Sequence, residues 1–297
     1  MNLDHLNYFK TLVELRSRSA TAEKLSITPS TLSLALGKLE QEVGVPLIEK
    51  KRGAVELTSE GESFYEYVDA SLRFLNNGLK MLKEKQFGSQ REIVVGTVFS
   101  AQSKDWSRII NQFRVRTHGA VLVKVDQSST PALIEKIKRG VVDVAFAGTM
   151  GEDPDIRFDP CWTQEAVLVV NRLHPLASRD EISLKELMDH YLISYNLTGP
   201  LGAELTNLVK DYDLTIDCLY SDEITLALMV VGNPDIMAIA CRSWILDSYD
   251  QDVKLVRILE APRDFHQMYL CSNARIAQSK TVAEFVDTAL RYCSCLR

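Results

Sequence analysis

The sequence has no long hydrophobic run. No stretch of its 297 residues approaches the roughly 20 apolar residues that a membrane-spanning helix needs. The first ten residues, MNLDHLNYFK, are polar, include Asp4 and lack the apolar segment of a secretory signal peptide. We therefore expect a cytoplasmic protein with no membrane partner.

The sequence also lacks the patterns of common enzyme and metal sites. The histidines show neither metal-ligand spacing nor a nucleophile partner: His5, His118, His174, His190 and His266. No P-loop or dinucleotide-binding glycine pattern is present, and residues 199–202, GPLG, read as a turn into a helix. Of the six cysteines, only Cys293 and Cys295 are close in sequence, and no second pair completes a zinc set. We expect a protein that is not an enzyme, with no cofactor and no metal site.

The chain carries no net positive charge. Its formal charge is −6, which argues against a protein coated in nucleic acid. Residues 1–60 hold eight basic and eight acidic side chains, so the whole negative excess lies in residues 61–297. A neutral N-terminal segment can still bind DNA if its basic side chains share one face. A length of 297 residues suits two domains, and 46% hydrophobic residues suffice for their cores.

Three short helices are predicted near the N-terminus. Apolar residues recur every three or four positions over residues 3–15, which is typical of a helix with one buried stripe. We expect Ser19 to cap a second helix over residues 20–25. Pro29 suits the first position of a third helix, which continues to Val43.

The third helix has two different faces. Leu32, Leu36 and Leu39 form the apolar face, and the opposite face carries small hydroxyl side chains near the helix start. Such a helix fits the major groove of DNA, about 12 Å wide, and its hydroxyls suit base and phosphate contacts. A basic loop between two short strands would lie over the adjacent DNA backbone as a wing. The predicted DNA-binding residues are Ser30, Thr31, Ser33, Leu34, Lys38, Lys50, Lys51 and Arg52. The alternative is a small helical bundle with a solvated basic turn.

Residues 61–88 predict a long helix with an apolar stripe. The stripe repeats at spacings of three and four and consists of Phe64, Val68, Leu72, Leu75, Leu79 and Leu82. That rhythm is typical of a seam for a partner helix. We therefore predict that this helix joins two chains.

From residue 91 onward, predicted strands alternate with predicted helices. The strands are expected at residues 92–96, 120–125, 141–147, 166–170, 191–194, 217–220 and 236–240. This alternation predicts a mainly parallel sheet with right-handed crossovers. The fold class is therefore α/β, preceded by a small helical module.

Several segments resemble those of the LysR-type transcriptional regulators. LNYFKTLVELRS, AEKL, LEQEVGVPLIEK and VELTSEGE follow one another as in the winged helix-turn-helix of that family. REIVVGTVFS, LIEKIKRGVVDVAFAG, AVLVVNRLHPLA and ISLKELMDHYLIS are similar to its effector-binding domain. The resemblance extends over almost the whole chain.

The resemblance implies a domain plan and a function. Residues 1–60 would form the winged helix-turn-helix, residues 61–88 the dimerisation helix, and residues 91–297 a two-subdomain effector domain similar to periplasmic binding proteins. The first subdomain would comprise about residues 91–164 and 268–297, and the second about residues 165–267. The implied protein binds double-stranded promoter DNA as a homodimer or homotetramer and contacts RNA polymerase. A small-molecule effector in the cleft between the subdomains would alter DNA bending.

The sequence departs from the family pattern in its DNA-binding segment. Leu34 and Ala35 stand where the family usually carries a basic residue and a glutamine. Arg18 replaces a usual aromatic residue, and Lys50 replaces the usual arginine of the wing. Fewer guanidinium and amide groups allow fewer bidentate base contacts. We hypothesise that hydroxyl groups and contact of Leu34 with thymine methyls dominate base readout, which favours an A·T-rich site.

The resemblance places the effector at loops that follow strands, here residues 97–102, 127–130, 146–148, 194–198 and 221–223. Hydroxyl and backbone N–H groups at helix starts bind small anions, and open α/β sheets bind ligands at the carboxyl ends of strands. For each hydroxyl, plain helix capping is the alternative, and the aromatic residues can equally belong to the core. The candidate effector-binding residues are Thr97, Phe99, Ser100, Gln102, Ser128, Thr130, Phe146, Tyr195, Thr198 and Glu223.

Two other functions stay open. Cys241 stands where the family often has proline, so a cysteine-based redox sensor of the same fold is one alternative. Arg242 is the only cationic neighbour in sequence that could depress its thiol pKa, which favours a buried, unreactive cysteine. A solute-binding protein is the other alternative, because two thirds of the chain has that architecture. The N-terminal module counts against it.

Overall fold

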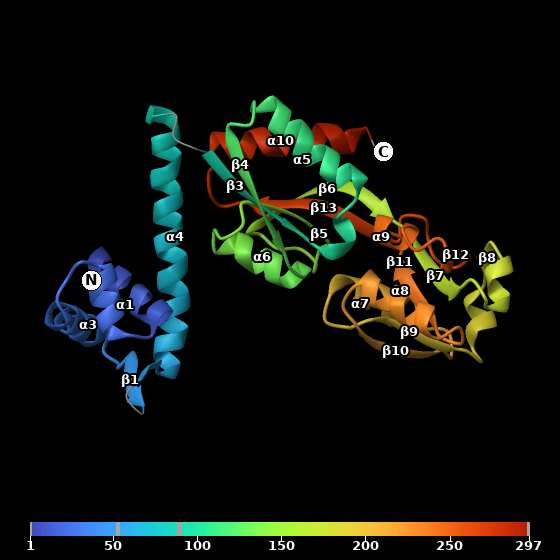
Figure 1. Cartoon of the computed structure of the whole chain (residues 1–297), viewed down its shortest axis with the longest axis horizontal. Helices are drawn as coiled ribbons and strands as arrows, with labels where there is room; N and C mark the ends of the chain where they lie inside the picture. The colour runs from blue at the N-terminus through green and yellow to red at the C-terminus, as the bar shows by residue number, and fades with distance from the viewer. Residues whose placement is uncertain (1, 52–53, 88–90, 296–297) are drawn as a thin grey trace. The chain divides into compact units, whose positions relative to one another are not determined.

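The structure is a computed structural model that describes residues 2–51, 54–87 and 91–295. The chain divides into two compact units, residues 1–87 and residues 88–297 (Figure 1). Each unit has its own hydrophobic core.

The first unit begins with three short helices. They are α1 (Leu3–Leu15), α2 (Arg18–Lys24) and α3 (Pro29–Val43). Helix α2 starts earlier than predicted, because the hydroxyl of Ser17, and not that of Ser19, accepts the N–H of Ala20 at 3.3 Å. Thr28 caps α3, and Gly44 ends it with a φ of 85°, a left-handed conformation that glycine adopts without strain.

A two-stranded hairpin and a long helix complete this unit. Strand β1 (Ile48–Lys51) pairs antiparallel with β2 (Ala54–Leu57), and α4 (Ser59–Phe87) follows. Gly61 lies where a Cβ atom would come within 2.0 Å of the carbonyl oxygen of Leu47, so only glycine fits this approach of α4 to the chain before the hairpin.

The apolar stripe of α4 serves two different purposes. Its first part packs inside the unit, because Val68 and Leu72 are buried with Phe9 of α1 and the leucines of α3. The prediction that the whole stripe is a seam for a partner helix is therefore wrong for this part. The second part is exposed: Leu75, Leu79 and Leu82 have 50%, 54% and 55% of their surface accessible. This second part remains free for another chain.

The second unit contains two β-sheets with helices around each. The first sheet has the order β4-β3-β5-β13-β6, with bounds β3 (Arg91–Thr97), β4 (Val121–Gln127), β5 (Val144–Ala147), β6 (Ile156–Gln164) and β13 (His266–Asn273). The second has the order β10-β9-β11-β7-β12-β8, with bounds β7 (Ala166–Asn171), β8 (Glu181–Ile182), β9 (Tyr191–Tyr195), β10 (Thr215–Tyr220), β11 (Met237–Cys241) and β12 (Val253–Ile258).

Both sheets are mainly parallel, as predicted, but each contains one strand that runs opposite to the others. In the first sheet, β13 runs antiparallel to its neighbours β5 and β6. In the second, β7 runs antiparallel to β11 and β12. The antiparallel strands belong to the two connections between the sheets, since β6 leads directly into β7 and the chain returns from β12 to β13 (Figure 1).

Helices cover the faces of both sheets. They are α5 (Lys104–Arg116), α6 (Thr130–Lys138), α7 (Pro200–Val209), α8 (Glu223–Gly232), α9 (Trp244–Asp247) and α10 (Lys280–Ser294), with short turns η1 (Phe99–Ala101), η2 (Pro175–Ser178) and η3 (Leu184–Leu187). Phe113 of α5 and Phe285 of α10 pack edge to face, with ring centroids 5.0 Å apart, on the first sheet. Leu133 and Ile137 of α6 pack in a second cluster with residues of the same sheet.

Candidate functional site

The exposed face of α3 carries the helix residues that the sequence predicted for DNA contact. They are Ser30, Thr31, Ser33, Leu34 and Lys38, and all five are exposed. Leu34 is 63% accessible, whereas Leu32 and Leu36, on the other face, are buried. An exposed leucine beside hydroxyl groups on a helix face matches what the major groove can accept.

The hydroxyl groups at the start of α3 interact with one another. The Thr28 hydroxyl accepts the backbone N–H of Thr31 at 3.1 Å and lies 2.8 Å from the hydroxyls of both Ser30 and Thr31. Capping therefore occupies part of their hydrogen-bonding capacity. It also holds the hydroxyls in one arrangement.

Arg18 joins this surface from a different helix. Its Nη1 donates a hydrogen bond to the hydroxyl of Ser33, across 3.1 Å. Its Nε is buried and has no hydrogen-bond partner among the described residues. The sequence showed Arg18 as a departure from the family pattern but did not predict it as a site residue, because it lies on α2 and its contact spans 15 positions.

The predicted wing corresponds to the hairpin of β1 and β2. The backbone of Lys50 and Lys51 belongs to β1, where these residues pair with Val55 and Ala54. Their side chains, and the whole of Arg52, lie outside the described residues. The roles assigned to these three basic residues therefore stay predictions.

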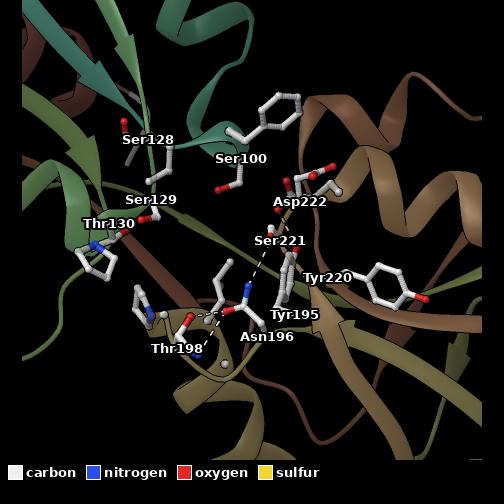
Figure 2. A pocket seen from close by; sticks show the side chains of 18 of the residues that line it. Ser100, Ser128, Ser129, Thr130, Tyr195, Asn196, Thr198, Tyr220, Ser221 and Asp222 are labelled. Carbon is white, nitrogen blue, oxygen red and sulfur yellow. Dashed lines mark hydrogen bonds between the residues drawn. The ribbon is translucent and has the colours of Figure 1, made fainter. Parts of the chain in front are cut away.

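The second unit contains a cavity of about 410 Å³ between its two sheets. Loops after strands β3, β4, β9 and β10 form its wall, together with the start of β13 (Figure 2). Seven predicted effector-binding residues line it: Phe99, Ser100, Ser128, Thr130, Tyr195, Thr198 and Glu223. The rule that ligands bind at the carboxyl ends of strands in α/β sheets thus agrees with the position of this cavity.

Three predicted residues do not line the cavity. Thr97 is fully buried at the end of β3, and its hydroxyl donates to the carbonyl of Val98 at 3.0 Å. Phe146 is fully buried in the core, where it stacks on Trp162 with ring centroids 5.6 Å apart. Gln102 is not in the wall, but its Nε2 donates at 2.8 Å to Oε1 of Gln127, which does line the cavity.

Other lining residues were not on the predicted list. They include Gln127, Ser129, Asn196, Ser221, Asp222 and His266. The first five lie within the loops predicted to hold the effector, residues 127–130, 194–198 and 221–223, although they were not among the candidate residues. His266 lies outside all predicted loops, because it reaches the cavity at the start of β13, a strand that the sequence pattern did not predict.

Two buried side chains, Tyr195 and Glu223, form the base of one side of the cavity. The Tyr195 hydroxyl donates to Oε1 of Glu223 at 2.7 Å and accepts the backbone N–H of Cys241 at 3.0 Å. Glu223 is 1% accessible, and burial raises its carboxyl pKa to about 6. Burial also raises the pKa of the Tyr195 hydroxyl well above its ordinary value, so this phenol remains a hydrogen-bond donor.

A second acidic contact involves His266. Its Nδ1 lies 2.7 Å from Oε2 of Glu204 on α7, and the imidazole is only 2% accessible. Gly148 allows the ring to lie there, because a Cβ atom at this position would come within 2.8 Å of His266 Cε1.

The opposite side of the cavity is rich in hydroxyl groups. Ser100 is 7% accessible, and its hydroxyl has no hydrogen-bond partner among the described residues. Thr130 begins α6, and its hydroxyl accepts the N–H of Gly148 at 3.3 Å. Ser129, the N-cap of α6, makes no capping bond with its side chain. The Ser128 hydroxyl is already engaged, with Asp126 at 2.7 Å and with Lys136.

The cysteines lie apart from this cavity. Cys241 is buried beside Tyr195 but is not part of the wall, and burial raises its thiol pKa well above the ordinary value. Burial also raises the thiol pKa of Cys271 to about 12. Because a thiolate is the reactive form, both cysteines are poorly suited to redox sensing.

In the described ranges, no group of three or more His, Cys, Asp or Glu side chains is arranged to hold a metal ion. None of the described helices combines the length and the hydrophobicity needed to cross a bilayer.

Two protein-family models match the chain. The model "LysR substrate binding domain" matches residues 88–294, and "Bacterial regulatory helix-turn-helix protein, lysR family" matches residues 3–62. These ranges cover the cavity and the exposed face of α3, respectively.

Similar proteins agree with these models. The chain is 30% identical to the HTH-type transcriptional regulator BenM of Acinetobacter baylyi over 78% of both chains. It is 27% identical to the regulator AlsR of Bacillus subtilis over 65% of this chain, and the match spans only 64% of AlsR. Full-length BenM has a crystal structure with a TM-score of 0.58, 25% identity and coverage of 100% of this chain and 97% of BenM. The effector binding domain of QuiR in complex with shikimate has a TM-score of 0.64 and 26% identity, covering 70% of this chain and 99% of that domain.

Proposed function

Because this chain belongs to the LysR family of DNA-binding transcriptional regulators, we propose that it controls transcription in response to a small molecule bound between its two sheets. Binding would alter the bending of promoter DNA and contact with RNA polymerase. The observation that carries this proposal is the cavity of about 410 Å³, with buried polar groups in its wall, inside the LysR substrate binding domain.

The face of α3 supports the DNA-binding part of the proposal. Five predicted contact residues are exposed together on one helix, with the guanidinium of Arg18 beside them. We propose that this face contacts one half-site of a two-fold symmetric operator. The basic hairpin loop would contact the adjacent phosphates.

Oligomerisation is proposed through the C-terminal half of α4. Leu75, Leu79 and Leu82 form an exposed apolar stripe with the spacing of a helix seam. Pairing of two such stripes would cover them and bring two copies of α3 to one operator. We propose a homodimer built in this way, which assembles further to a homotetramer.

Two lines of support favour a small organic ligand. The cavity is of the size that encloses metabolites, and several hydroxyl and carboxyl groups converge on it. QuiR, whose effector domain has the same fold at 26% identity, has been crystallised with shikimate. The ligand would bind one arrangement of the oligomer more tightly than another. Its binding would thereby favour that arrangement and change how the oligomer contacts DNA.

A two-part experiment tests the proposal. The full-length chain is screened by thermal shift against a metabolite library, since a bound ligand raises the apparent stability. The same protein is tested in an electrophoretic mobility shift with the DNA upstream of its own gene, with and without each hit. We expect sequence-specific binding and a ligand-dependent change in the mobility or affinity of the complex. Loss of all discrimination between this DNA and unrelated DNA would contradict the proposal.

A further inference from the structure

The two sides of the cavity have opposite chemical character. One side presents the hydroxyls of Ser100, Ser129 and Thr130, from loops at the first sheet (Figure 2). The other presents the carboxyl groups of Asp222 and Glu223, from the turn into α8 beside the second sheet (Figure 2). A ligand that fills the cavity therefore meets hydrogen-bond donors at one end and carboxylates at the other.

The hydroxyl side contains a buried group without a partner. The Ser100 side chain is more than nine-tenths buried, points into the cavity and makes no side-chain hydrogen bond to described residues (Figure 2). Because the hydroxyl borders the cavity and has no partner in the described part of the chain, it can donate to an acceptor on a ligand there. The start of α6 lies on the same side and adds the partial positive charge of a helix N-terminus. Both features favour a carboxylate or a similar acceptor on the ligand.

The acidic side has unused capacity for a cation. Glu223 accepts one side-chain hydrogen bond, from Tyr195. Asp222 caps α8: its Oδ1 accepts the N–H of Thr225 at 2.8 Å, and the Thr225 hydroxyl donates to Oδ1 and Oδ2 at 3.0 and 3.1 Å, so both oxygens have only neutral partners. The described wall contains no lysine or arginine to balance these two carboxylates. A ligand without a positive charge would leave them uncompensated in a partly dehydrated space, which is unfavourable.

The ionisable groups around Glu223 come from five elements. Asp222 precedes it at the start of α8, Tyr195 faces it from β9, and Cys241 lies near it on β11. His266 of β13 is also nearby, and Glu204 of α7 pairs with that imidazole. Because the imidazole is paired with the Glu204 carboxylate at 2.7 Å, this pair brings no net positive charge to the site.

We infer that the ligand of this cavity is a small zwitterion, of the chemical class of amino acids. Its ammonium group would lie against Glu223 and Asp222, and its carboxylate would accept hydrogen bonds from Ser100 and from the start of α6. This inference rests on the proposed function and specifies its ligand class. Lys136, which donates to the wall residue Ser128, is already paired with Asp126 at 2.7 Å, so it does not supply the missing charge at the acidic side.

Proton exchange distinguishes a zwitterion from a simple acid. Glu223 is partly protonated near pH 6, because its pKa lies at about that value. An ammonium group beside it favours the carboxylate, so a zwitterion releases a proton on binding near pH 6. An anion without an amine favours the protonated form and takes up a proton. The affinity for a zwitterion should therefore rise with pH through about 6, and that for a simple acid should fall.

The experiment uses matched sets of probes on the full-length protein. Each set contains an α- or ω-amino acid, the hydroxy acid that lacks its amine, and the amine that lacks its carboxylate. Calorimetry at pH 6 in two buffers of different ionisation enthalpy gives both the affinity and the number of protons exchanged. We expect at least one amino acid to bind at least tenfold more tightly than its two analogues, with release of protons.

Variants separate the two ends of the ligand. Glu223→Gln should weaken binding of the amino acid at least tenfold and leave the hydroxy acid unaffected or tighter. Ser100→Ala should weaken both compounds, and it serves as the second variant if Glu223→Gln does not fold. Glu152→Gln, which removes an exposed carboxylate outside the cavity wall, is the matched control and should change neither affinity.

The binding results distinguish failure of the zwitterion inference from failure of the proposed function on which it rests. Hydroxy acids that bind as tightly as amino acids, or an unchanged amino-acid affinity in Glu223→Gln, would overturn the zwitterion and leave a ligand-responsive regulator. If no probe binds while the wider metabolite screen yields a ligand that responds to Ser100→Ala, the zwitterion is also rejected. If neither screen yields any ligand, the proposed small-molecule function fails as well.

Discussion

Arg18 of α2 donates a hydrogen bond to Ser33 of α3, and so a guanidinium lies on the exposed side of the helix-turn-helix. Helix α3, the second helix of this motif, has Leu34 at a position where LysR-type regulators usually carry a basic residue. Arg18 on the preceding helix therefore adds positive charge to this surface, beside that of Lys38 on α3. It is placed beside the hydroxyl groups that are candidates for base contact.

Replacement of Arg18 by alanine should weaken DNA binding. If the guanidinium contacts a phosphate or a base edge, its loss should cost about 1–3 kcal/mol of binding free energy and lower the salt dependence by about one released ion. Fluorescence anisotropy with operator DNA at several salt concentrations measures both quantities. Arg114→Ala, an exposed arginine on α5 in the other unit, is the charge-matched control. Equal salt slopes for the wild type and Arg18→Ala would show that Arg18 only supports Ser33.

Leu34 should contribute to a preference for A·T-rich operators. It is the large apolar side chain on the exposed face of α3, and the hydroxyls near it are partly occupied by Thr28. Contact with thymine methyl groups is the form of base readout open to leucine. Selection from random DNA should return A·T-rich half-sites, and Leu34→Ala should lose about 1 kcal/mol of affinity for them. G·C-rich half-sites from the wild-type protein would contradict this prediction.

The exposed leucines of α4 should hold two chains together. We expect Leu75→Glu combined with Leu79→Glu to shift the protein to monomers in sedimentation equilibrium, because like charges would meet across an apolar seam. DNA affinity should fall as well, since two half-sites would no longer be bound at once. Tyr67→Ser, an exposed position on the same helix but off the stripe, should leave the oligomer intact. A double variant that keeps the native mass would place the dimer contact elsewhere.

Local patterns predicted most of the helices and the loops around the cavity. Pro29 and Gly44 marked the ends of α3 correctly, because first-position proline and terminal glycine act on the chain nearest to them. The stripe of α4 could not be divided in the same way. Val68, buried in its own unit, and Leu75, exposed, have the same spacing in the sequence and differ only in what the fold places opposite them.

The sequence predicted which loops form the cavity wall, but it did not predict which side chains of these loops face the cavity. Ser100 and Glu223 follow strands that the sequence revealed, so their place in the wall could be expected. Phe146 has the same kind of position but turns into the core, where Trp162 stacks on it. His266 reaches the cavity through the pairing of β13 with β5 and β6, and such long-range pairing leaves no local pattern.

Glu223 should lower the stability of the ligand-free protein at neutral pH. Its folded-state pKa of about 6 lies above the ordinary value for glutamate, so the folded chain binds this proton more tightly than the unfolded chain does. The resulting stabilisation is complete below about pH 4 and is lost as the pH rises through about 6. Above that pH, the buried carboxylate lowers the free energy of unfolding by about 2 kcal/mol.

Glu223→Gln should therefore raise the Tm of the ligand-free protein at pH 7.5, and the gain should shrink at pH 5. Thermal unfolding monitored by circular dichroism at both pH values measures it, with Glu152→Gln as the control. If Glu223→Gln lowers the Tm equally at both pH values, the carboxylate is instead fully compensated by Tyr195 and its other neighbours.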